Sequence, residues 1–563
     1  MKKLNSLITF KSAVLSLLMI VLATPAWAQR NSVFYDSSDK SLSIRGAVTV
    51  TKNMIESVAG YNQAETLYIS GEVVEILDHA FDGCDNIKLI NIRESYTPLE
   101  AHNPFKNISK KASSLKVICN RNINAAAFYT NQVLTEVEFG GQLPCLTEIN
   151  DACFCLCPNL TKVDLSKAEK LKTIGSSAFE NCPKLSSITM PYSVTYIGDY
   201  AFYGCSSLTS INIPSITSIE AKTFWGCFSL TDVNVPSSVT KIGEGAFGLC
   251  ESLAYLSLPG NVNSIGDKAF YGCKALKSFA ASGMETIGSQ AFKDCTNLYN
   301  FHLRSKLKSI SKDAFEGCTN LKTLYVFSKD LMNPATPYTA DDNLLTRFPY
   351  VTTASFAEAV TAIGDYAFAD TKGLSALEQV TFVAPVEIGE GAFSINKKLT
   401  TINGNIKSAA TSAFIQCTSL KSVSFTGASE IGISAFYGCT GLEQVTLPEG
   451  LVSIGEVAFM GCSGLNKVIC HKPEPISIPN TTFDYSTQKQ AELIVPAASV
   501  NAYKAAPVWK EFFKITDATG IDGIKMDSKK VTGIFTLDGK KISNAESLPA
   551  GIYIKNGKKV VIK

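Results

Sequence analysis

The chain repeats one pattern of apolar and polar positions over most of its length. One period reads Leu-x-x-Ile-x-Ile-Pro, then Val-x-x-Ile-Gly, then Ala-Phe-x-x-Cys. The alternating apolar pair, such as Ile211 and Ile213, predicts a short strand with one buried face. Proline follows the strand because it cannot donate a hydrogen bond to the ladder. We expect the glycine of Ile-Gly to supply a turn, and the phenylalanine and leucine to fill the interior.

The repeat phenylalanine sets a period of 22 or 23 residues. Clear copies occur at Phe154, Phe179, Phe202, Phe224, Phe247, Phe270, Phe292, Phe315, Phe368, Phe393, Phe414, Phe436 and Phe459, and weaker ones at Phe81, Phe105, Phe128 and Phe483. The longer gap between Phe315 and Phe368 predicts one degenerate turn plus an insertion at about 327–350, which contains Pro334 and Pro337. A single turn buries too little surface to be stable alone, so the turns must stack into one elongated solenoid.

The repeated Ile-Gly-x-x-Ala-Phe-x-x-Cys-x-x-Leu, seen at 197–208, 242–253 and 265–276, resembles the BspA-like (Treponema-type) leucine-rich repeat surface proteins of Bacteroidetes. The resemblance covers about 65–495. It implies a β-rich, right-handed leucine-rich-repeat solenoid with turns of 22–23 residues, short strands and little helix. Residues 29–64 would then cap the N-terminal end of the solenoid, and residues 496–516 the C-terminal end.

Both ends of the chain carry further signals. Residues 1–28 have three lysines, an apolar run and the Ala26-Trp27-Ala28 cleavage pattern of a signal peptide. They predict export to a secreted or cell-surface location, with outer-membrane association as one variant, and no later segment predicts a transmembrane helix. Residues 517–563 alternate like strands around an Asn-Gly turn and predict a small β-module. It resembles the C-terminal modules of exported Bacteroidetes proteins, some of which are sorting signals, although a simple β-appendage is the alternative.

The charge and the motif content exclude several functions. The chain has 52 basic and 50 acidic residues, a net charge of +2. Removal of a leader with three lysines leaves 2 − 3 = −1, which argues against nucleic-acid binding. No nucleophile elbow, phosphate-binding loop or metal-protease motif occurs. We therefore expect no enzyme activity, no cofactor and no metal site, with a hydrolase built on paired acidic residues in the 327–350 insertion as the rival hypothesis.

The cysteines follow the repeat. Twelve of the 17 lie three residues after a repeat phenylalanine: Cys84, Cys157, Cys182, Cys205, Cys227, Cys250, Cys273, Cys295, Cys318, Cys417, Cys439 and Cys462. Their side chains should point in parallel, which disfavours the disulfide dihedral, so we predict a ladder of free packing thiols. Thr371 and Asn396 occupy the same position, as expected of a structural slot. Five cysteines lie out of phase: Cys119, Cys145, Cys153, Cys155 and Cys470. A bridge from Cys145 to Cys153 or Cys155 remains an alternative for these.

Repeat stacks bind macromolecules through extended surfaces. The outward strand positions include four aromatic candidates for partner contact: Tyr255, Tyr299, His302 and Tyr325. A second candidate row follows the repeat phenylalanine directly: Tyr203, Trp225 and Tyr271. The insertion is a third candidate, since insertions in solenoids often decorate one face. For the first row the alternative is that tyrosine is simply a favourable residue at an exposed strand position. For the second row the alternative is that the rings only pack. A continuous repeat surface without catalytic motifs predicts a non-enzymatic protein that binds a macromolecule. The family resemblance implies an adhesin for a host or bacterial surface protein, and glycan binding for polysaccharide capture is the alternative.

Overall fold

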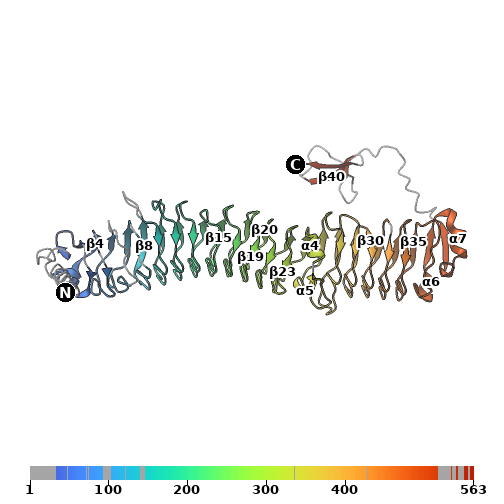
Figure 1. Ribbon diagram of the computed structural model, residues 1–563, viewed down its shortest axis with the longest axis horizontal. Helices are drawn as coiled ribbons and strands as arrows, with labels where there is room; N and C mark the ends of the chain where they lie inside the picture. Colours follow the sequence, from blue (N-terminus) through green and yellow to red (C-terminus); the bar gives the residue numbers. More distant parts are fainter. Residues whose placement is uncertain are drawn as a thin grey trace, which may run out of the picture.

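A computed structural model describes residues 33–517 apart from 47–48, 72, 74, 93–102, 121, 124, 140–145, 335 and 428, together with the backbone of four strands between 534 and 562. The repeats form an elongated, gently curved stack (Figure 1). It is a β-solenoid of about 20 coils with turns of about 23 residues, and helix accounts for 7%. The predicted fold class is therefore confirmed. The proposed signal peptide lies outside the described residues.

Each coil contributes one longer strand to the long-strand face. The strands of this face are β2 (Ser41–Arg45), β4 (Thr66–Ser70), β6 (Leu89–Ile92), β7 (Leu115–Cys119), β8 (Leu134–Phe139), β10 (Lys162–Asp164), β12 (Ser187–Thr189), β14 (Ser210–Asn212), β16 (Asp232–Asn234), β18 (Tyr255–Leu258), β20 (Ser278–Ala281), β22 (Asn300–Leu303), β24 (Thr323–Val326), β25 (Thr353–Phe356), β27 (Gln379–Phe382), β29 (Thr401–Asn403), β31 (Ser422–Ser424), β33 (Gln444–Leu447), β35 (Lys467–Cys470), β36 (Glu492–Val495) and β37 (Lys514–Asp517). Within this face the strands pair in parallel, with breaks in the pairing at β12/β14, β16/β18, β20/β22 and β29/β31. In the pair of β18 and β20, for example, Leu256 lies opposite Phe279. Alternate side chains are buried, as the period-two pattern predicted.

The Ile-Gly segments form a second row, the short-strand face. Its strands are β3 (Thr49–Val50), β5 (Glu75–Ile76), β9 (Glu148–Ile149), β11 (Thr173–Ile174), β13 (Tyr196–Ile197), β15 (Ser218–Ile219), β17 (Lys241–Ile242), β19 (Ser264–Ile265), β21 (Thr286–Ile287), β23 (Ser309–Ile310), β26 (Ala362–Ile363), β28 (Val386–Ile388), β30 (Ile406–Ala409), β32 (Glu430–Ile431) and β34 (Ser453–Ile454). They too pair in parallel, and the row is interrupted between β5 and β9, between β13 and β15, and between β23 and β26.

The glycine of Ile-Gly has a different role from the expected turn. A Cβ on Gly266 would lie 2.7 Å from the backbone of Gly243, so glycine is needed where successive coils touch. The left-handed turn comes two residues later, at Lys268 with φ 55°. In the coil before it, Gly245 occupies the same position with φ 59°.

The third side of each coil is the phenylalanine turn. The repeat phenylalanines stack in a continuous column from Phe81 to Phe315 and again from Phe368 to Phe483. Their ring centroids are 4.6 Å apart at the closest, between Phe105 and Phe128, and 5.6 Å apart in other pairs such as Phe247 and Phe270. This column and the inward strand residues form one core along the solenoid.

Distinct elements lie at the two ends. At the N-terminal end, β1 (Val33–Asp36) pairs antiparallel with β2, and α3 (Lys52–Glu56) and the short helix η1 (Tyr61–Gln63) follow. The C-terminal end holds α6 (Tyr485–Gln490), η2 (Ala497–Ser499), α7 (Val500–Ala505) and η3 (Trp509–Glu511). Here the ring of Phe512 meets Phe483 edge-on at 5.2 Å, and the Trp509 indole N–H donates to the Ile476 carbonyl. Aromatic side chains therefore cover the last ring of the column.

Four further strands lie beyond residue 517: β38 (Ile534–Phe535), β39 (Lys541–Ile542), β40 (Gly551–Lys555) and β41 (Lys558–Ile562). They form an antiparallel sheet in the order β39-β38-β40-β41. The segments between these strands lie outside the described residues.

Candidate functional site

The four aromatic candidates of the long-strand face come from three coils. Tyr255 begins β18, Tyr299 directly precedes β22, His302 lies within β22 and Tyr325 lies within β24. Tyr255 and Tyr299 are 65% and 56% exposed. The structure brings His302 and Tyr325 together as cross-strand neighbours with ring centroids 4.7 Å apart. Tyr255 stands apart from this pair, because β20 separates its strand from β22.

His302 is the centre of a small aromatic and basic cluster. Its ring also stacks on Phe327 at 6.0 Å, and the Arg304 guanidinium lies 5.3 Å from the centroid of the Phe327 ring. Burial and the nearby Arg304 lower the pKa of His302, so the neutral imidazole is favoured. Neither His302 Nδ1 nor Arg304 Nε has a hydrogen-bond partner among the described residues. Both atoms are buried, so a partner on this face would contact the exposed parts of the two side chains and not these nitrogens.

The second candidate row lies on the phenylalanine turns, away from the strand face. The indole of Trp225 stacks on Tyr271 with centroids 5.9 Å apart, although a whole coil separates them. Gly248 of that coil makes the room, because a Cβ there would lie 2.1 Å from the Trp225 ring. Tyr203 packs at 5.7 Å against Tyr200 of its own turn. Gly248, which interrupts the aromatic row in the sequence, is thus what lets Trp225 and Tyr271 meet, and all three candidate rings are half-buried.

The cysteines three residues after the phenylalanines share one contact. Each thiol from Cys157 to Cys462 in this row donates to the carbonyl of the phenylalanine one coil earlier, at 3.0–3.3 Å between sulfur and oxygen. Asn131 and Asn396 stand in the same slot and donate to Phe105 and Phe368 in the same way. Burial raises the pKa of Cys273 to about 12. In these coils the slot therefore holds a hydrogen-bond donor rather than a reactive thiolate. Thr371, predicted to occupy the same slot, does not occupy it: it is exposed, and its hydroxyl donates to the Ala340 carbonyl.

The out-of-phase cysteines differ in setting. Cys119, Cys153, Cys155 and Cys470 are buried and form no disulfide, as is true of the other cysteines in the described part of the chain. The Cys470 sulfur lies 3.3 Å from the Tyr503 hydroxyl. Cys145, the partner weighed for Cys153 or Cys155, lies outside the described residues. Within the described residues no group of three or more His, Cys, Asp or Glu side chains is placed to hold a metal ion.

The insertion turns out to be one modified coil between β24 and β25. Helix α4 (Lys329–Met332) replaces the short strand, because the Met332 carbonyl accepts from Gly364 as a strand residue would. Helix α5 (Leu344–Arg347) replaces the phenylalanine turn, since the Leu344 N–H donates to the Ala367 carbonyl. The Phe348 ring then meets Phe315 at a tilt, 4.8 Å away. The solenoid therefore continues through this coil, while the short-strand ladder does not.

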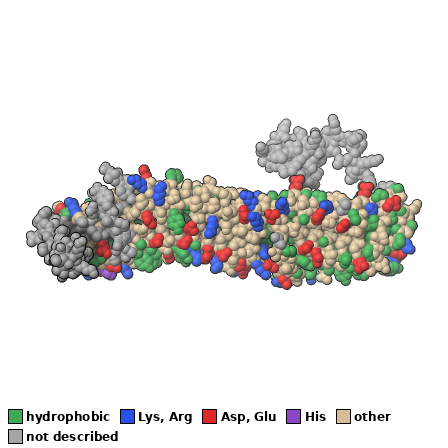
Figure 2. Space-filling model, in the orientation of Figure 1, with side chains coloured by type: hydrophobic (Ala, Val, Ile, Leu, Met, Phe, Trp, Pro, Cys, Tyr) green, Lys and Arg blue, Asp and Glu red, His purple; other side chains and the backbone are tan. Residues whose placement is uncertain are grey.

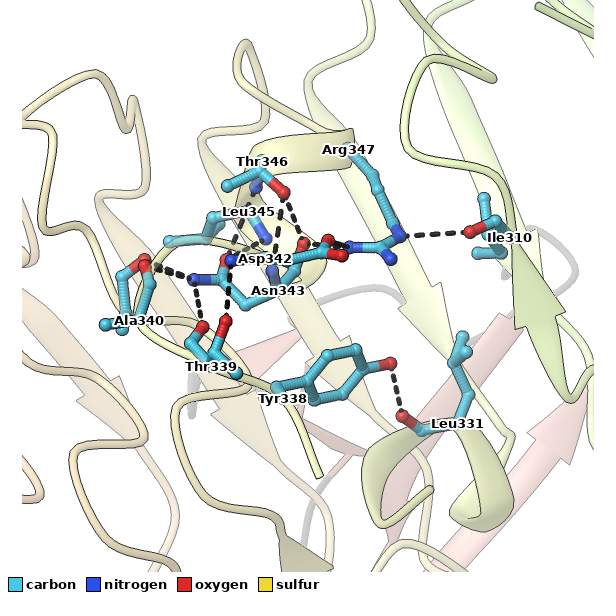
Figure 3. A network of polar contacts seen from close by, with 11 residues as sticks. Ile310, Leu331, Tyr338, Thr339, Ala340, Asp342, Asn343, Leu345, Thr346 and Arg347 are labelled. Carbon is cyan, nitrogen blue, oxygen red and sulfur yellow. Dashed lines mark hydrogen bonds and ion pairs between the residues drawn. The ribbon is translucent and has the colours of Figure 1, made fainter. Parts of the chain in front are cut away.

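Polar side chains close the interrupted edge (Figure 3). Asn343 caps α5 by accepting from Leu345 and Thr346, and its amide donates to the Ala369 carbonyl of the next coil. Arg347 Nε donates at 3.0 Å to the Ile310 carbonyl, the group that would otherwise face the missing strand. The sequence indicated an insertion through its broken period and prolines, but it carried no signal for this arginine contact.

Grooves flank the loop between the two helices. One of about 490 Å³ lies toward β23 and includes Ser309, Tyr338 and Arg347 in its lining. Another of about 310 Å³ lies toward β26 and β28 and shares Tyr338. The loop is thus a ridge with a groove on each side. A third groove, of about 210 Å³, lies at α5 beside Leu374.

The BspA-type leucine-rich repeat region matches the sequence in six overlapping copies, at residues 28–111, 54–171, 102–231, 217–333, 341–466 and 426–503. The chain belongs to the BspA-type leucine-rich repeat family. These copies together cover 28–333 and 341–503, so the stretch left between them, 334–340, is the loop of the modified coil. No match was found among curated proteins.

Several solved structures similar to this chain are bacterial leucine-rich repeat proteins. One from Bacteroides ovatus is 21% identical, covers 78% of this chain and 93% of its own, and gives a TM-score of 0.36. A leucine-rich cell surface protein from Faecalibacterium prausnitzii is 25% identical, with coverages of 62% and 83% and a TM-score of 0.26. A leucine-rich repeat protein of T. pallidum is 20% identical, with coverages of 39% and 86% and a TM-score of 0.25. The family assignment rests on the repeat match alone.

Proposed function

We propose that this chain is an exported, non-enzymatic adhesin that binds a protein of a host matrix or of a cell surface through its long-strand face. Leucine-rich repeats of this family are typical of binding scaffolds on surface and secreted proteins. Among the described residues, no helix is both long and apolar enough to cross a membrane. The export signal in the sequence supports the extracellular location.

The observation that carries the proposal is the near absence of charge at the outward positions within the strands of the long-strand face. Charged residues such as Lys322 and Glu378 lie one position before these strands. The twelve strands from β12 to β33 each place two residues outward: Ser187, Thr189, Ser210, Asn212, Asp232, Asn234, Tyr255, Ser257, Ser278, Ala280, Asn300, His302, Thr323, Tyr325, Thr353, Ser355, Gln379, Thr381, Thr401, Asn403, Ser422, Ser424, Gln444 and Thr446. Asp232 alone among these carries a fixed charge. Charged residues are depleted and tyrosine is enriched in the cores of protein interfaces, and this face has both properties.

Charged side chains lie at the two ends of the same face. Lys116 on β7 bridges Glu136 and Glu138 on β8, at 3.6 and 3.0 Å. At the other end, Lys514 on β37 bridges Glu492 on β36 at 2.7 Å. Over the side of the molecule drawn in Figure 2, acidic and basic side chains are interspersed. The face therefore has an uncharged centre and charged margins, which suits a protein partner better than a nucleic acid.

The test is an array of matrix and cell-surface proteins probed with the secreted chain. Substitutions Ser257→Glu and Ser278→Glu place two carboxylates in the uncharged centre beside Tyr255 and should weaken capture at least tenfold. Tyr192→Ser is the matched control, because Tyr192 is 87% exposed but lies beyond the end of β12. The adhesin proposal is rejected if no array protein is captured above background, or if the glutamate variants bind like the wild type. Capture of glycans alone would support the polysaccharide alternative.

A further inference from the structure

The modified coil offers a compact binding site that the regular coils lack. The groove toward β23 has a volume of about 490 Å³, within the range of small-ligand sites. Its wall on one side is the last strand before the interruption, and on the other it is the loop that the family repeat leaves unmatched. We name it the Arg347 groove, and it is separate from the long-strand face.

Arg347 is held rigidly in this groove. Nε donates to the Ile310 carbonyl, and Nη1 donates to Asp342 Oδ1 at 2.7 Å and to the Asn343 carbonyl. The guanidinium carbon lies 5.8 Å from the centre of the Tyr338 ring. Nη2 has no hydrogen-bond partner among the described residues, and Figure 3 shows it beside the Ile310 contact, on the Tyr338 side. A fixed guanidinium with unused donors fits a carboxylate group.

The remaining lining supplies donors and apolar surface. Ser309, Thr336 and Thr339 bring hydroxyl groups to the groove, while Pro334 and Pro337 bring apolar surface. The Tyr338 ring is fixed because its hydroxyl donates to the Leu331 carbonyl at 2.8 Å. Hydroxyls beside a fixed ring and proline faces suit a sugar, which has a rim of hydroxyl groups and apolar C–H faces.

Charge separates this groove from its neighbour across the loop. Two basic side chains, Lys308 and Arg347, and one acidic side chain, Asp342, line the Arg347 groove. Lys308 also pairs with Glu285 at 2.8 Å, outside the lining. The groove toward β26 is lined by Asp365 and Glu387 and by no basic residue. An anionic ligand is therefore favoured on the β23 side of the loop and repelled on the other.

We propose that the Arg347 groove binds an acidic sugar unit, a uronic or sialic acid, with its carboxylate on Arg347 and its hydroxyl groups on the serine and threonine side chains. Three properties support this class: an unused guanidinium edge, hydroxyl-bearing walls and a net positive lining. The site lies outside the repeat unit, so it gives this chain a ligand that the shared fold does not.

The experiment is a calorimetric titration of the whole secreted chain with sodium glucuronate, and separately with glucose. Saturable binding of glucuronate that weakens with added salt is expected, without binding of glucose. Lys308→Glu should weaken glucuronate binding about tenfold by reversing one wall charge. Lys421→Glu is the matched control, because Lys421 forms an equivalent cross-coil pair with Glu443 far from the groove.

Arg347→Lys should also weaken glucuronate binding about tenfold, since lysine cannot present the planar pair of N–H donors of a guanidinium group. Because Arg347 also closes the strand edge, Thr336→Trp provides an independent variant that fills the groove and leaves this contact intact. The proposal is overturned if glucose binds as well as glucuronate, if both Lys308→Glu and Thr336→Trp bind like the wild type, or if an acidic dipeptide binds more tightly than the sugar acid. None of these outcomes depends on the adhesin test, which perturbs a different face.

Discussion

Asn396 offers the sharpest test of the donor slot. Its amide occupies the place of a ladder cysteine and donates to the Phe368 carbonyl at 2.6 Å, while its Oδ1 is buried without a partner. Asn396→Cys keeps a donor for that carbonyl, as Cys417 shows one coil later at 3.1 Å. It also removes the unsatisfied oxygen, whose burial costs about 1–3 kcal/mol.

Part of the stability gained by removing this unsatisfied oxygen is offset by a lost hydrogen bond. The Asn396 amide also donates to the Phe393 carbonyl at 3.0 Å, and losing this bond costs about 0.5–1.5 kcal/mol. The net expectation is that Asn396→Cys stabilises the protein by about 1 kcal/mol. Asn396→Asp, nearly the same size, should destabilise it by about 3 kcal/mol or more, because a carboxylate cannot donate and would sit against the carbonyl oxygen.

The measurement is urea unfolding followed by circular dichroism, with hydrogen exchange of residues 390–420 as a local readout. The local readout is needed because each repeat contacts only its neighbours and a mutation acts mainly on nearby coils. If Asn396→Cys unfolds at lower urea than the wild type, or if Asn396→Asp is tolerated, the slot is not a donor position and the reasoning fails.

Three further outcomes follow from the repeat geometry. Val457 holds φ at 48°, a strained conformation for a β-branched residue, so Val457→Gly should raise the melting temperature by an amount equivalent to about 0.5–1 kcal/mol; a lower melting temperature would contradict the strain. Thiol titration in denaturant without reductant should find twelve or more free thiols, and fewer than about six would refute a reduced ladder. Burial raises the pKa of Cys273 and Cys417 from 9.0 to about 12, so their contribution to stability is complete below pH 9 and is lost as pH rises toward 12. Cys273→Val should therefore flatten the alkaline decline of the urea midpoint, and an unchanged slope would argue against thiol linkage.

The solenoid could be predicted because its signals are local and repeated. The alternation of Leu256 and Leu258 with Tyr255 and Ser257 shows which side of each strand is buried. The period then places equivalent residues side by side, so the column of phenylalanines follows from spacing alone. The prediction that the glycine of Ile-Gly supplies a turn was wrong. A side chain is excluded at Gly266 by the backbone of the neighbouring coil, and not by the φ angle of Gly266 itself. A glycine in a repeat motif indicates that a small residue is needed there, but it does not distinguish a turn from a close contact between coils.

The contacts at the candidate sites were harder to predict from the sequence, because they too depend on residues of neighbouring coils. Tyr255, His302 and Tyr325 could be assigned to outward strand positions, but the stack of His302 on Phe327 depends on side-chain angles. Trp225 and Tyr271 could be assigned to one row of the repeat, but the spacing did not show that their rings meet across Gly248. The hydrogen bond from Arg347 to the Ile310 carbonyl joins residues 37 positions apart, a separation that does not match the repeat period.

The two proposed surfaces follow from opposite properties of the same architecture. A regular coil repeats its side chains about 4.8 Å apart along the axis, so chemistry on the long-strand face is spread into rows and can recognise only a partner with an extended surface. A compact ligand must be enclosed by side chains on several sides. A regular coil does not provide this, so a site of that kind requires an interruption of the repeat. Here it fails where α4 replaces a short strand, which opens the edge of β23 and brings Arg347 to it. We therefore expect affinity for large partners to depend on the uncharged strand face, and selectivity for a small ligand to depend on the one modified coil described between β24 and β25.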